Sequence, residues 1–248
     1  MDRGTGTAGR PGGTLPRLVA ADERREGRGR VNSRERILGR VRRALADLPD
    51  DDVPYEEAVA RGYLREHGRR GTRETVDLLA ENLADYRALV HRATESELPA
   101  LLGRLLAERG SRSVLVPPLL PPEWLSAADA ARVDDREGST PHELDEVESV
   151  VTGCALAVAE TGTIVLDGSP DQGRRRITLV PDHHICVVRV PDQVVSSVPQ
   201  ALERLDAARP LTWISGPSAT SDIELDRVEG VHGPRTLEVV LVSGDSDG

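Results

Sequence analysis

Three polar, glycine-containing segments separate short apolar runs in the last third of the chain, and this arrangement restricts the fold more than any other feature. The segments are residues 159–163 (AETGT), 215–224 (SGPSATSDIE) and 230–235 (GVHGPR). Each lies beside an apolar run with strand character, so each is expected at the end of a strand. Hydroxyls, open backbone N–H groups and a nearby carboxylate are the groups that such a loop offers to an anionic ligand.

The chain alternates between helical and strand-like patterns. Helices are expected over residues 33–47, 72–93, 98–109 and 191–208, with two short helices between 121 and 147. Strands are expected over residues 113–116, 131–133, 150–151, 155–158, 163–166, 177–180, 185–190, 211–214 and 237–242. A helix, a glycine, a short buried strand and a proline in succession indicate an α/β unit, so an open α/β fold is predicted.

This pattern divides the chain into three parts. Residues 1–30 are rich in Gly and Arg without periodicity, which predicts a disordered tail. Residues 31–110 are expected to form an N-terminal helical segment, and residues 111–248 the α/β core.

The charged residues exclude several functions. All 32 basic residues are arginine, which removes Schiff-base and P-loop lysine chemistry. The net charge is −10, and residues 1–48 hold 12 Arg against 6 acidic residues, so the remainder carries −16. An acidic body disfavours binding to nucleic acid or to an anionic membrane. The basic N-terminus is either a solvated tail with one basic helix or a contact for such a surface.

The two cysteines, Cys154 and Cys186, each lie within an apolar run. An iron–sulfur cubane needs about four thiolates, so this chain is not expected to hold a cluster or a cysteine zinc site by itself. Buried, reduced thiols in a cytoplasmic protein are predicted instead. The first 30 residues lack the apolar stretch of a signal peptide, and no run approaches about 18 apolar residues, so no membrane insertion is expected.

The second polar segment follows an apolar strand, and ligands bind at the carboxyl ends of strands in open α/β sheets. Ser215, Gly216 and Ser218 are therefore candidate ligand-binding residues, with a simple tight turn as the alternative. Asp222 and Glu224 would share one face of a strand. Asp222 is a further candidate for ligand binding, and a solvated pair of carboxylates is the alternative.

The third segment places one imidazole and one guanidinium in a glycine-containing turn. Arg235 can hold a carboxylate or phosphate through two parallel hydrogen bonds. His232 is a candidate catalytic residue because imidazole titrates near neutral pH, with a structural role in the turn as the alternative.

In the first segment, Glu160 is the second candidate catalytic residue. A carboxylate between two apolar runs is costly to bury alone, so Glu160 should pair with an arginine or line a pocket. Thr161, Gly162 and Thr163 are candidate ligand-binding residues. One cleft is expected to gather Glu160, Ser218, Asp222, His232 and Arg235.

Two other patterns have simpler interpretations. Adjacent residues of an extended chain point in opposite directions, so His183 and His184 are not expected to share a metal, and no metal site is predicted. The arginines at 174–176 predict a solvated turn, with anion binding as the alternative.

The ordered motifs together resemble the LUD-domain family. They are residues 159–163, the arginines before residues 177–181 (ITLVP), and residues 183–185 (HHI), 216–224 and 230–235. The resemblance covers residues from about 33 to 243. Ala219 stands where the family frequently has a basic residue, and Ser221 where it frequently has alanine.

The resemblance implies an open sheet similar to that of the sugar-phosphate isomerase and CoA-transferase superfamily. It also implies a subunit of a cytoplasmic three-protein system that oxidises L-lactate to pyruvate, binding a small organic anion. The two partner proteins would hold the iron–sulfur clusters, and this chain would hold no cofactor. The absence of a flavin or nicotinamide fingerprint argues against a complete dehydrogenase. The alternatives are a stand-alone enzyme or binder for a phosphorylated or CoA-like ligand, and a non-catalytic scaffold for the partners.

Overall fold

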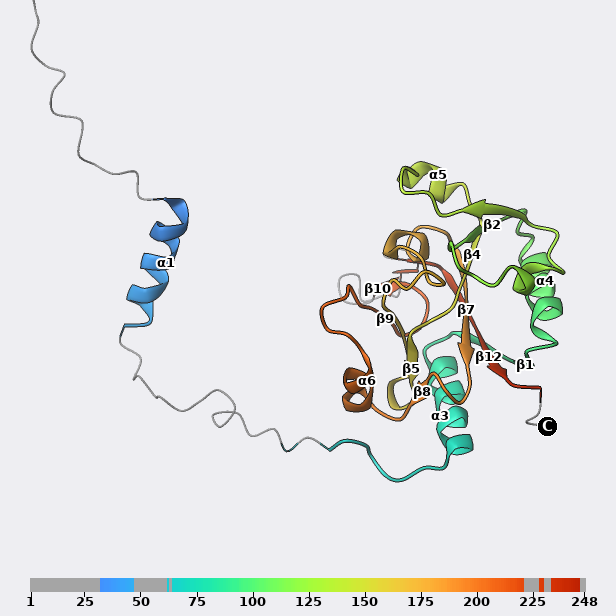
Figure 1. Ribbon diagram of the computed structural model, residues 1–248, viewed down its shortest axis with the longest axis horizontal. Coiled ribbons are helices and arrows are strands. Elements are labelled where there is room, and N and C mark those ends of the chain that lie inside the picture. The colour runs from blue at the N-terminus through green and yellow to red at the C-terminus, as the bar shows by residue number, and fades with distance from the viewer. Residues whose placement is uncertain (1–31, 47–61, 63, 221–227, 230–232, 246–248) are drawn as a thin grey trace, which may run out of the picture. The chain divides into compact units, whose positions relative to one another are not determined.

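The computed structural model describes residues 32–46, 62, 64–220, 228–229 and 233–245 (Figure 1). The chain divides into two compact units, one up to Arg61 and one from Gly62 to Gly248. The unit from Gly62 onward includes most of the expected N-terminal helical segment, so its boundary does not coincide with residue 110.

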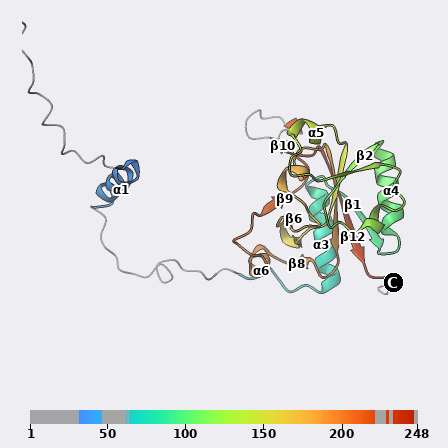
Figure 2. The ribbon, with the colours of Figure 1, turned by 45° about the horizontal axis from the view of Figure 1, so that its top comes forward.

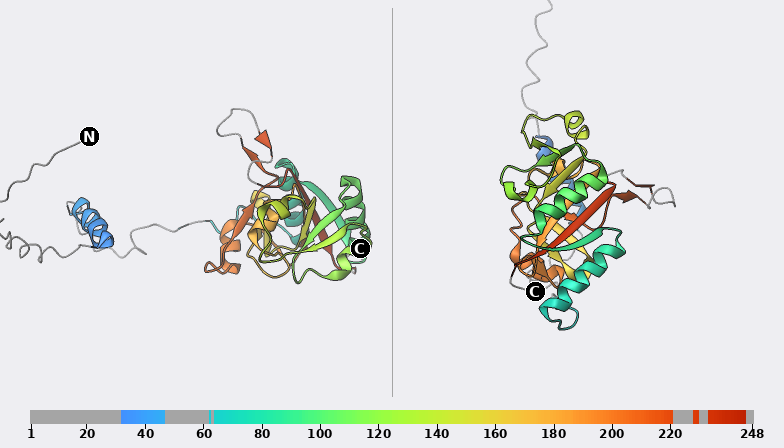
Figure 3. Two further views of the ribbon diagram at one scale, coloured as in Figure 1. Left: turned by 90° about the horizontal axis from the view of Figure 1, so that it is seen from above. Right: turned by 90° about the vertical axis from the view of Figure 1, so that its right-hand side faces the viewer.

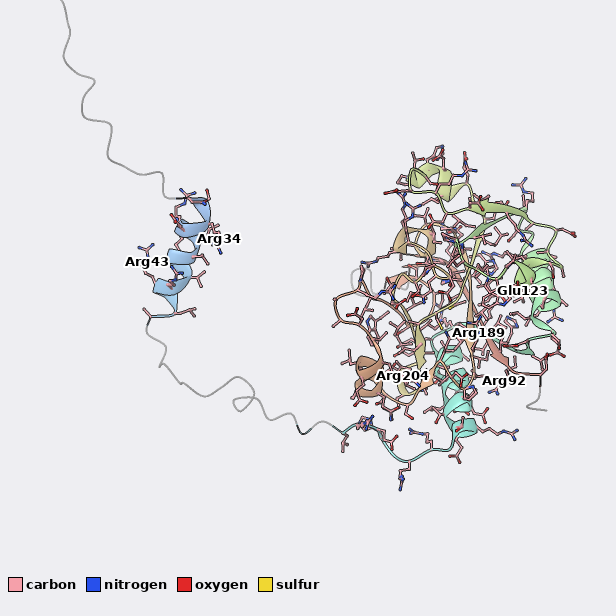
Figure 4. The ribbon with its side chains drawn as sticks, in the orientation of Figure 1. Arg34, Arg43, Arg92, Glu123, Arg189 and Arg204 are labelled. Atoms are coloured by element: carbon pink, nitrogen blue, oxygen red, sulfur yellow. The ribbon has the colours of Figure 1, made fainter. Side chains whose placement is uncertain are left out.

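In the first unit, helix α1 spans Ser33–Ala44, as the sequence pattern predicts. It begins at Asn32, whose side-chain oxygen accepts a hydrogen bond from the Arg34 backbone N–H at 3.2 Å. Ile37, Val41 and Leu45 form a stripe that is 47–59% exposed. Figure 4 shows Arg34 and Arg43 on this helix.

The second unit is built on a six-stranded sheet in which every neighbouring pair is parallel. Its order is β1-β12-β7-β4-β2-β3. The strands are β1 (Leu89–Thr94), β12 (Thr236–Ser243), β7 (His183–Arg189), β4 (Ser149–Thr152), β2 (Ser113–Val116) and β3 (Ala131–Asp134). This sheet confirms the predicted open α/β fold.

Both faces of the parallel sheet are covered, as burial of a parallel sheet requires. Helix α4 (Leu98–Arg109) and the 3-10 helix η1 (Pro122–Leu125) pack with Ile185 and Val187 on one face. Helix α3 (Thr72–Asp85) packs with Cys186 and Val188 on the other. Figure 2 shows α4 and α3 on opposite sides of β1 and β12.

A four-stranded sheet of order β8-β5-β6-β9 contributes to the α3 side of the core. Its strands are β5 (Leu156–Val158), β6 (Thr163–Leu166), β8 (Val194–Val195) and β9 (Thr212–Ile214). The remaining elements are α5 (Pro141–Asp145), η2 (Ala159–Thr161), η3 (Arg175–Thr178), α6 (Val198–Arg204), β10 (Ala219–Thr220) and β11 (Val228–Glu229). Strands β10 and β11 pair in an antiparallel way, and Figure 3 shows them projecting from the unit.

Three expected elements differ from the structure. The helix expected over 72–93 ends at Asp85. Two residues later, Arg87 takes a positive φ of 68°, and the chain then forms strand β1 beside β12. No strand forms over 177–180, because η3 covers Ile177 and Thr178 and the next two residues form a turn and a bend. The helix expected from 191 begins only at Val198, because Pro199 fits the first turn of a helix and not its interior.

A chain of polar side chains crosses the α4 face of the parallel sheet. His183 is fully buried, with its Nδ1 2.8 Å from the Ser149 hydroxyl and its Nε2 3.0 Å from the Glu238 carboxylate. The other Glu238 oxygen lies 2.6 Å from His91 Nε2, and the Ser149 hydroxyl lies 2.5 Å from that of Ser111. The chain joins strands β4, β7, β12 and β1 and satisfies polar groups that burial would otherwise penalise.

The Glu238→Gln variant should lose roughly 2 kcal/mol of unfolding free energy at pH 7, because it removes charge-assisted hydrogen bonds to two histidines. Burial raises the pKa of Glu238, but hydrogen bonds from His183 and His91 outweigh it and leave the pKa below its usual value. The stabilisation is therefore present above the unfolded pKa and is lost as pH falls through the lower folded pKa. Urea unfolding at pH 7 and at pH 4 measures both effects. Glu108→Gln, at an exposed carboxylate, is the control, and equal losses in the two variants would contradict the prediction.

Candidate functional site

A cavity of about 230 Å³ lies among the segment after β9, helix η3 and the first residues of β7 and β12. The second and third polar segments both line it, through Ser215, Gly216, Ser218 and Gly233. The Ser218 backbone N–H donates to the Pro234 carbonyl at 2.9 Å, which joins the two segments directly. The cavity therefore lies at the amino ends of two parallel strands, and β9, which precedes the second segment, belongs to the smaller sheet.

The first polar segment reaches the cavity wall through hydroxyl groups. The Thr161 hydroxyl donates to the Thr163 hydroxyl at 2.8 Å, and the Thr163 hydroxyl lies 2.8 Å from that of Ser215. Of these three residues, Ser215 lines the cavity. Thr163, itself bonded to Thr161, thus holds the Ser215 hydroxyl in place from outside the cavity lining.

Gly162 and Gly216 allow the first two segments to pack against the end of helix α3. Their φ values are +55° and +79°, in the left-handed region that favours glycine. A Cβ on Gly162 would lie 2.6 Å from the Asn82 carbonyl carbon, and one on Gly216 would overlap the Tyr86 carbonyl oxygen. Asn82 also donates its side-chain amide to the Ala159 carbonyl at 2.7 Å. Close packing therefore accounts for both glycines.

Glu160 is paired with an arginine, as one of its two predicted interpretations requires. Its side chain is 14% exposed and accepts hydrogen bonds from the His67 backbone at 2.8 Å and from Arg70 at 3.3 Å. His67 Nδ1 lies 3.0 Å from its other oxygen. Burial raises the pKa of Glu160, but these partners outweigh it and lower the pKa below its usual value. Glu160 is not part of the described cavity lining.

Arg235 also lies outside the described lining of the cavity. Its guanidinium is 3.6 Å from the Asp182 carboxylate, and both side chains are more than half exposed. His232 and Asp222 lie outside the described residues. Of the five residues expected to share one cleft, Ser218 lines this cavity, whereas Glu160 and Arg235 do not, and the other two lie outside the described residues.

Two cavity residues carry chemistry that the sequence did not single out for this site. His184, 1% exposed, has its Nε2 2.8 Å from the Thr152 hydroxyl. Burial, together with neighbouring His183, lowers the pKa of His184 to about 3, so its imidazole is neutral at physiological pH. His183 and His184 bond to partners on opposite faces of the sheet, which confirms that they point apart.

Arg175 is the second of these residues. Its neighbours are held elsewhere: Arg174 pairs with Asp135, and Arg176 donates to the Glu137 carbonyl at 2.5 Å. Arg175 is exposed and lines the cavity mouth. The anion-binding alternative for the arginine run is therefore available to one arginine of the three.

The described lining of this cavity combines one arginine, one neutral histidine and several hydroxyls, without an Asp or Glu side chain. Such a lining offers hydrogen-bond donors and one positive charge to a ligand. It suits a small anion that carries a hydroxyl or carbonyl group.

The two cysteines are buried and free, as predicted. Among the described residues, no cluster of three or more His, Cys, Asp and Glu side chains could hold a metal ion. No helix in the described part of the chain has the length and apolar character to cross a membrane.

His184 should make the protein less stable in acid. The pKa of His184 is lower in the folded state than in the unfolded state. Between pH 6.5 and about 3, the unfolded state therefore binds a proton at this imidazole and the folded state does not. The unfolding free energy should then fall by about 1.4 kcal/mol per pH unit from this group. His184→Gln, measured by urea unfolding between pH 7 and 4, should remove that part of the slope. His142→Gln, at an exposed histidine, should leave the slope unchanged; an unaltered slope in His184→Gln would contradict the assignment.

Gly216→Ala should be much more destabilising than Gly168→Ala. Both glycines have positive φ, so both variants carry backbone strain of about 1 kcal/mol. Only position 216 adds steric overlap with Tyr86, because a Cβ at 168 meets nothing within 4 Å. A loss of roughly 3 kcal/mol or more is expected for Gly216→Ala by thermal or urea unfolding. Similar losses for both variants would show that the contact with α3 does not govern this loop.

Known proteins place the chain in a family. The family model of the LUD domain matches residues 76–242. Lactate utilization protein C of Deinococcus radiodurans is 47% identical over 174 residues, covering 68% of this chain and 80% of the relative. Lactate utilization protein C of Geobacillus thermodenitrificans is 27% identical over 246 residues, covering 87% and 98% of the two chains.

A solved structure agrees with the sequence relatives. The crystal structure of a DUF162 family protein from Deinococcus radiodurans is 39% identical with a TM-score of 0.60. The match covers 70% of this chain and 99% of that chain. The chain described here belongs to the LUD domain family.

Proposed function

We propose that this protein is a subunit of a cytoplasmic system that oxidises L-lactate to pyruvate, and that the cavity beside His184 and Arg175 binds a small organic anion. Relatives named lactate utilization protein C support a role in lactate utilization. The observation that carries the anion proposal is the lining, which presents Arg175 and several hydroxyls without a described carboxylate.

The size of the cavity favours a small ligand. Pockets for drug-sized molecules range from about 300 to 1,000 Å³, whereas this cavity measures about 230 Å³. A three-carbon hydroxy acid or oxo acid suits that volume better than a CoA-like ligand. The Arg175 guanidinium would hold the carboxylate, and Ser215, Ser218 and His184 would offer hydrogen bonds to the remaining oxygen.

The chemistry divides the reaction among subunits. Oxidation of a hydroxyl to a carbonyl removes two electrons, which side chains cannot accept without a redox cofactor. We therefore assign binding and orientation of the acid to this chain, and electron transfer to iron–sulfur clusters in two partner proteins. His184, held neutral by burial, would serve as a hydrogen-bonding group and not as a standing positive charge.

Arg175→Ala should weaken the binding of L-lactate and pyruvate by about 30-fold, because a charge-assisted bond contributes about 2 kcal/mol. Titration calorimetry of the full chain measures the change. The compound 1,2-propanediol, which replaces the lactate carboxylate with an alcohol, should bind weakly to both proteins.

Arg73→Ala, which removes an exposed arginine of α3 outside the cavity, is the matched control and should leave affinity unchanged. Failure of the wild-type chain to bind either acid would contradict the anion pocket. If such a chain still supported lactate oxidation with its partners, the scaffold alternative would be favoured.

A further inference from the structure

A second cavity, of about 350 Å³, lies at the opposite end of the parallel sheet. It is lined by Glu95 just after β1, by Arg189 at the end of β7, and by Val242 and Asp245 at the end of β12. Pro121 and Trp124, at helix η1, close one side. In open α/β sheets, ligands bind outside the carboxyl ends of the strands, and this cavity occupies that position across three adjacent strands.

Arg189 provides an oriented cation in this cavity. Its guanidinium lies 5.2 Å from the centre of the Trp124 ring, and Trp124 is buried. A cation–π contact with the indole holds the guanidinium beside the ring, and its N–H groups can still bind a ligand. The positive charge of Arg189 acts to lower the pKa of Asp171, although burial leaves that pKa above its usual value. Among the described residues, no hydrogen bond or ion pair engages the Arg189 guanidinium. The N–H edge is therefore available to a ligand carboxylate.

Three carboxylates also line this cavity, those of Glu95, Glu123 and Asp245. Asp245 is oriented by the Ser96 backbone N–H, which donates to it at 3.0 Å. Figure 4 shows Glu123 and Arg189 in the part of the unit that contains helix α4. With one positive and three negative side chains, the lining repels a simple anion and attracts a ligand that also carries a positive charge.

We propose that this second cavity binds a small zwitterion of the α-amino acid class, with its carboxylate on Arg189 and its ammonium group toward the carboxylates of Glu95, Glu123 and Asp245. The two cavities then differ in charge and in ligand. The cavity beside Arg175, without a described carboxylate, takes an anion, whereas the cavity beside Arg189 requires both charges. This inference does not depend on the role of the first cavity.

Three ligands of nearly equal size separate the contributions. L-Alanine carries both charges, L-lactate replaces the ammonium group with a hydroxyl, and L-alaninamide replaces the carboxylate with a neutral amide. Ligand-observed NMR with the full chain compares their binding. Arg189→Gln should weaken L-alanine binding at least about tenfold, the loss expected for a charge-assisted pair. Arg175→Ala should leave L-alanine binding unchanged.

Two further variants guard against unfolding as an explanation. Glu123→Gln changes an exposed side chain and should weaken L-alanine binding without a change in melting temperature. Arg92→Gln removes an exposed arginine of β1 outside this lining and should have no effect on L-alanine. Wild-type binding of L-alaninamide as tight as that of L-alanine would overturn the proposal, as would the absence of L-alanine binding. Binding of L-lactate that is lost in Arg189→Gln would also overturn it.

Discussion

The parallel pairing of β7 with β12 and β4 is the constraint on which the rest of the structure depends. It fixes which face of the sheet each side chain of β7 meets, since successive residues of a strand point to opposite faces. His183 is thereby placed in the polar chain under α4, and His184 in the cavity on the α3 side. A shift of the register by one residue would exchange the two and leave both imidazoles without their partners.

The two ends of β7 and β12 support different electrostatic environments. At the amino ends, the polar segments around Ser215 and Gly233 close a cavity with one arginine and neutral hydrogen-bonding groups. At the carboxyl ends, the second cavity is lined by Arg189 and by three carboxylates. Because the two linings differ in charge, the two proposed sites would favour ligands with different charge distributions.

Helix α3 connects the first cavity to the core. Its residues Leu79 and Leu83 are fully buried against the parallel sheet, and its C-terminal end meets Gly162 and Gly216. The loops that shape the cavity therefore rest on a helix that is itself anchored by apolar packing. Ser215 is held further by the hydroxyls behind it. Preorganisation of this kind lowers the cost of binding a small ligand.

The sequence by itself determined the features that depend on neighbouring residues. Helix α4 ends at Gly110 because glycine adopts the left-handed cap at little cost, and His183 and His184 point apart because strands alternate. The alternation of helical and strand-like patterns predicted the α/β class, and the polar segment after an apolar strand drew attention to Ser215, Gly216 and Ser218. The tertiary structure decided the features that depend on partners far along the chain: residues 89–94 became strand β1 because β12 offers hydrogen bonds to them. Glu160 lies with Arg70, and Arg175 lines the cavity while Arg235 does not, because which charged groups meet depends on how distant segments pack, and no local pattern encodes that.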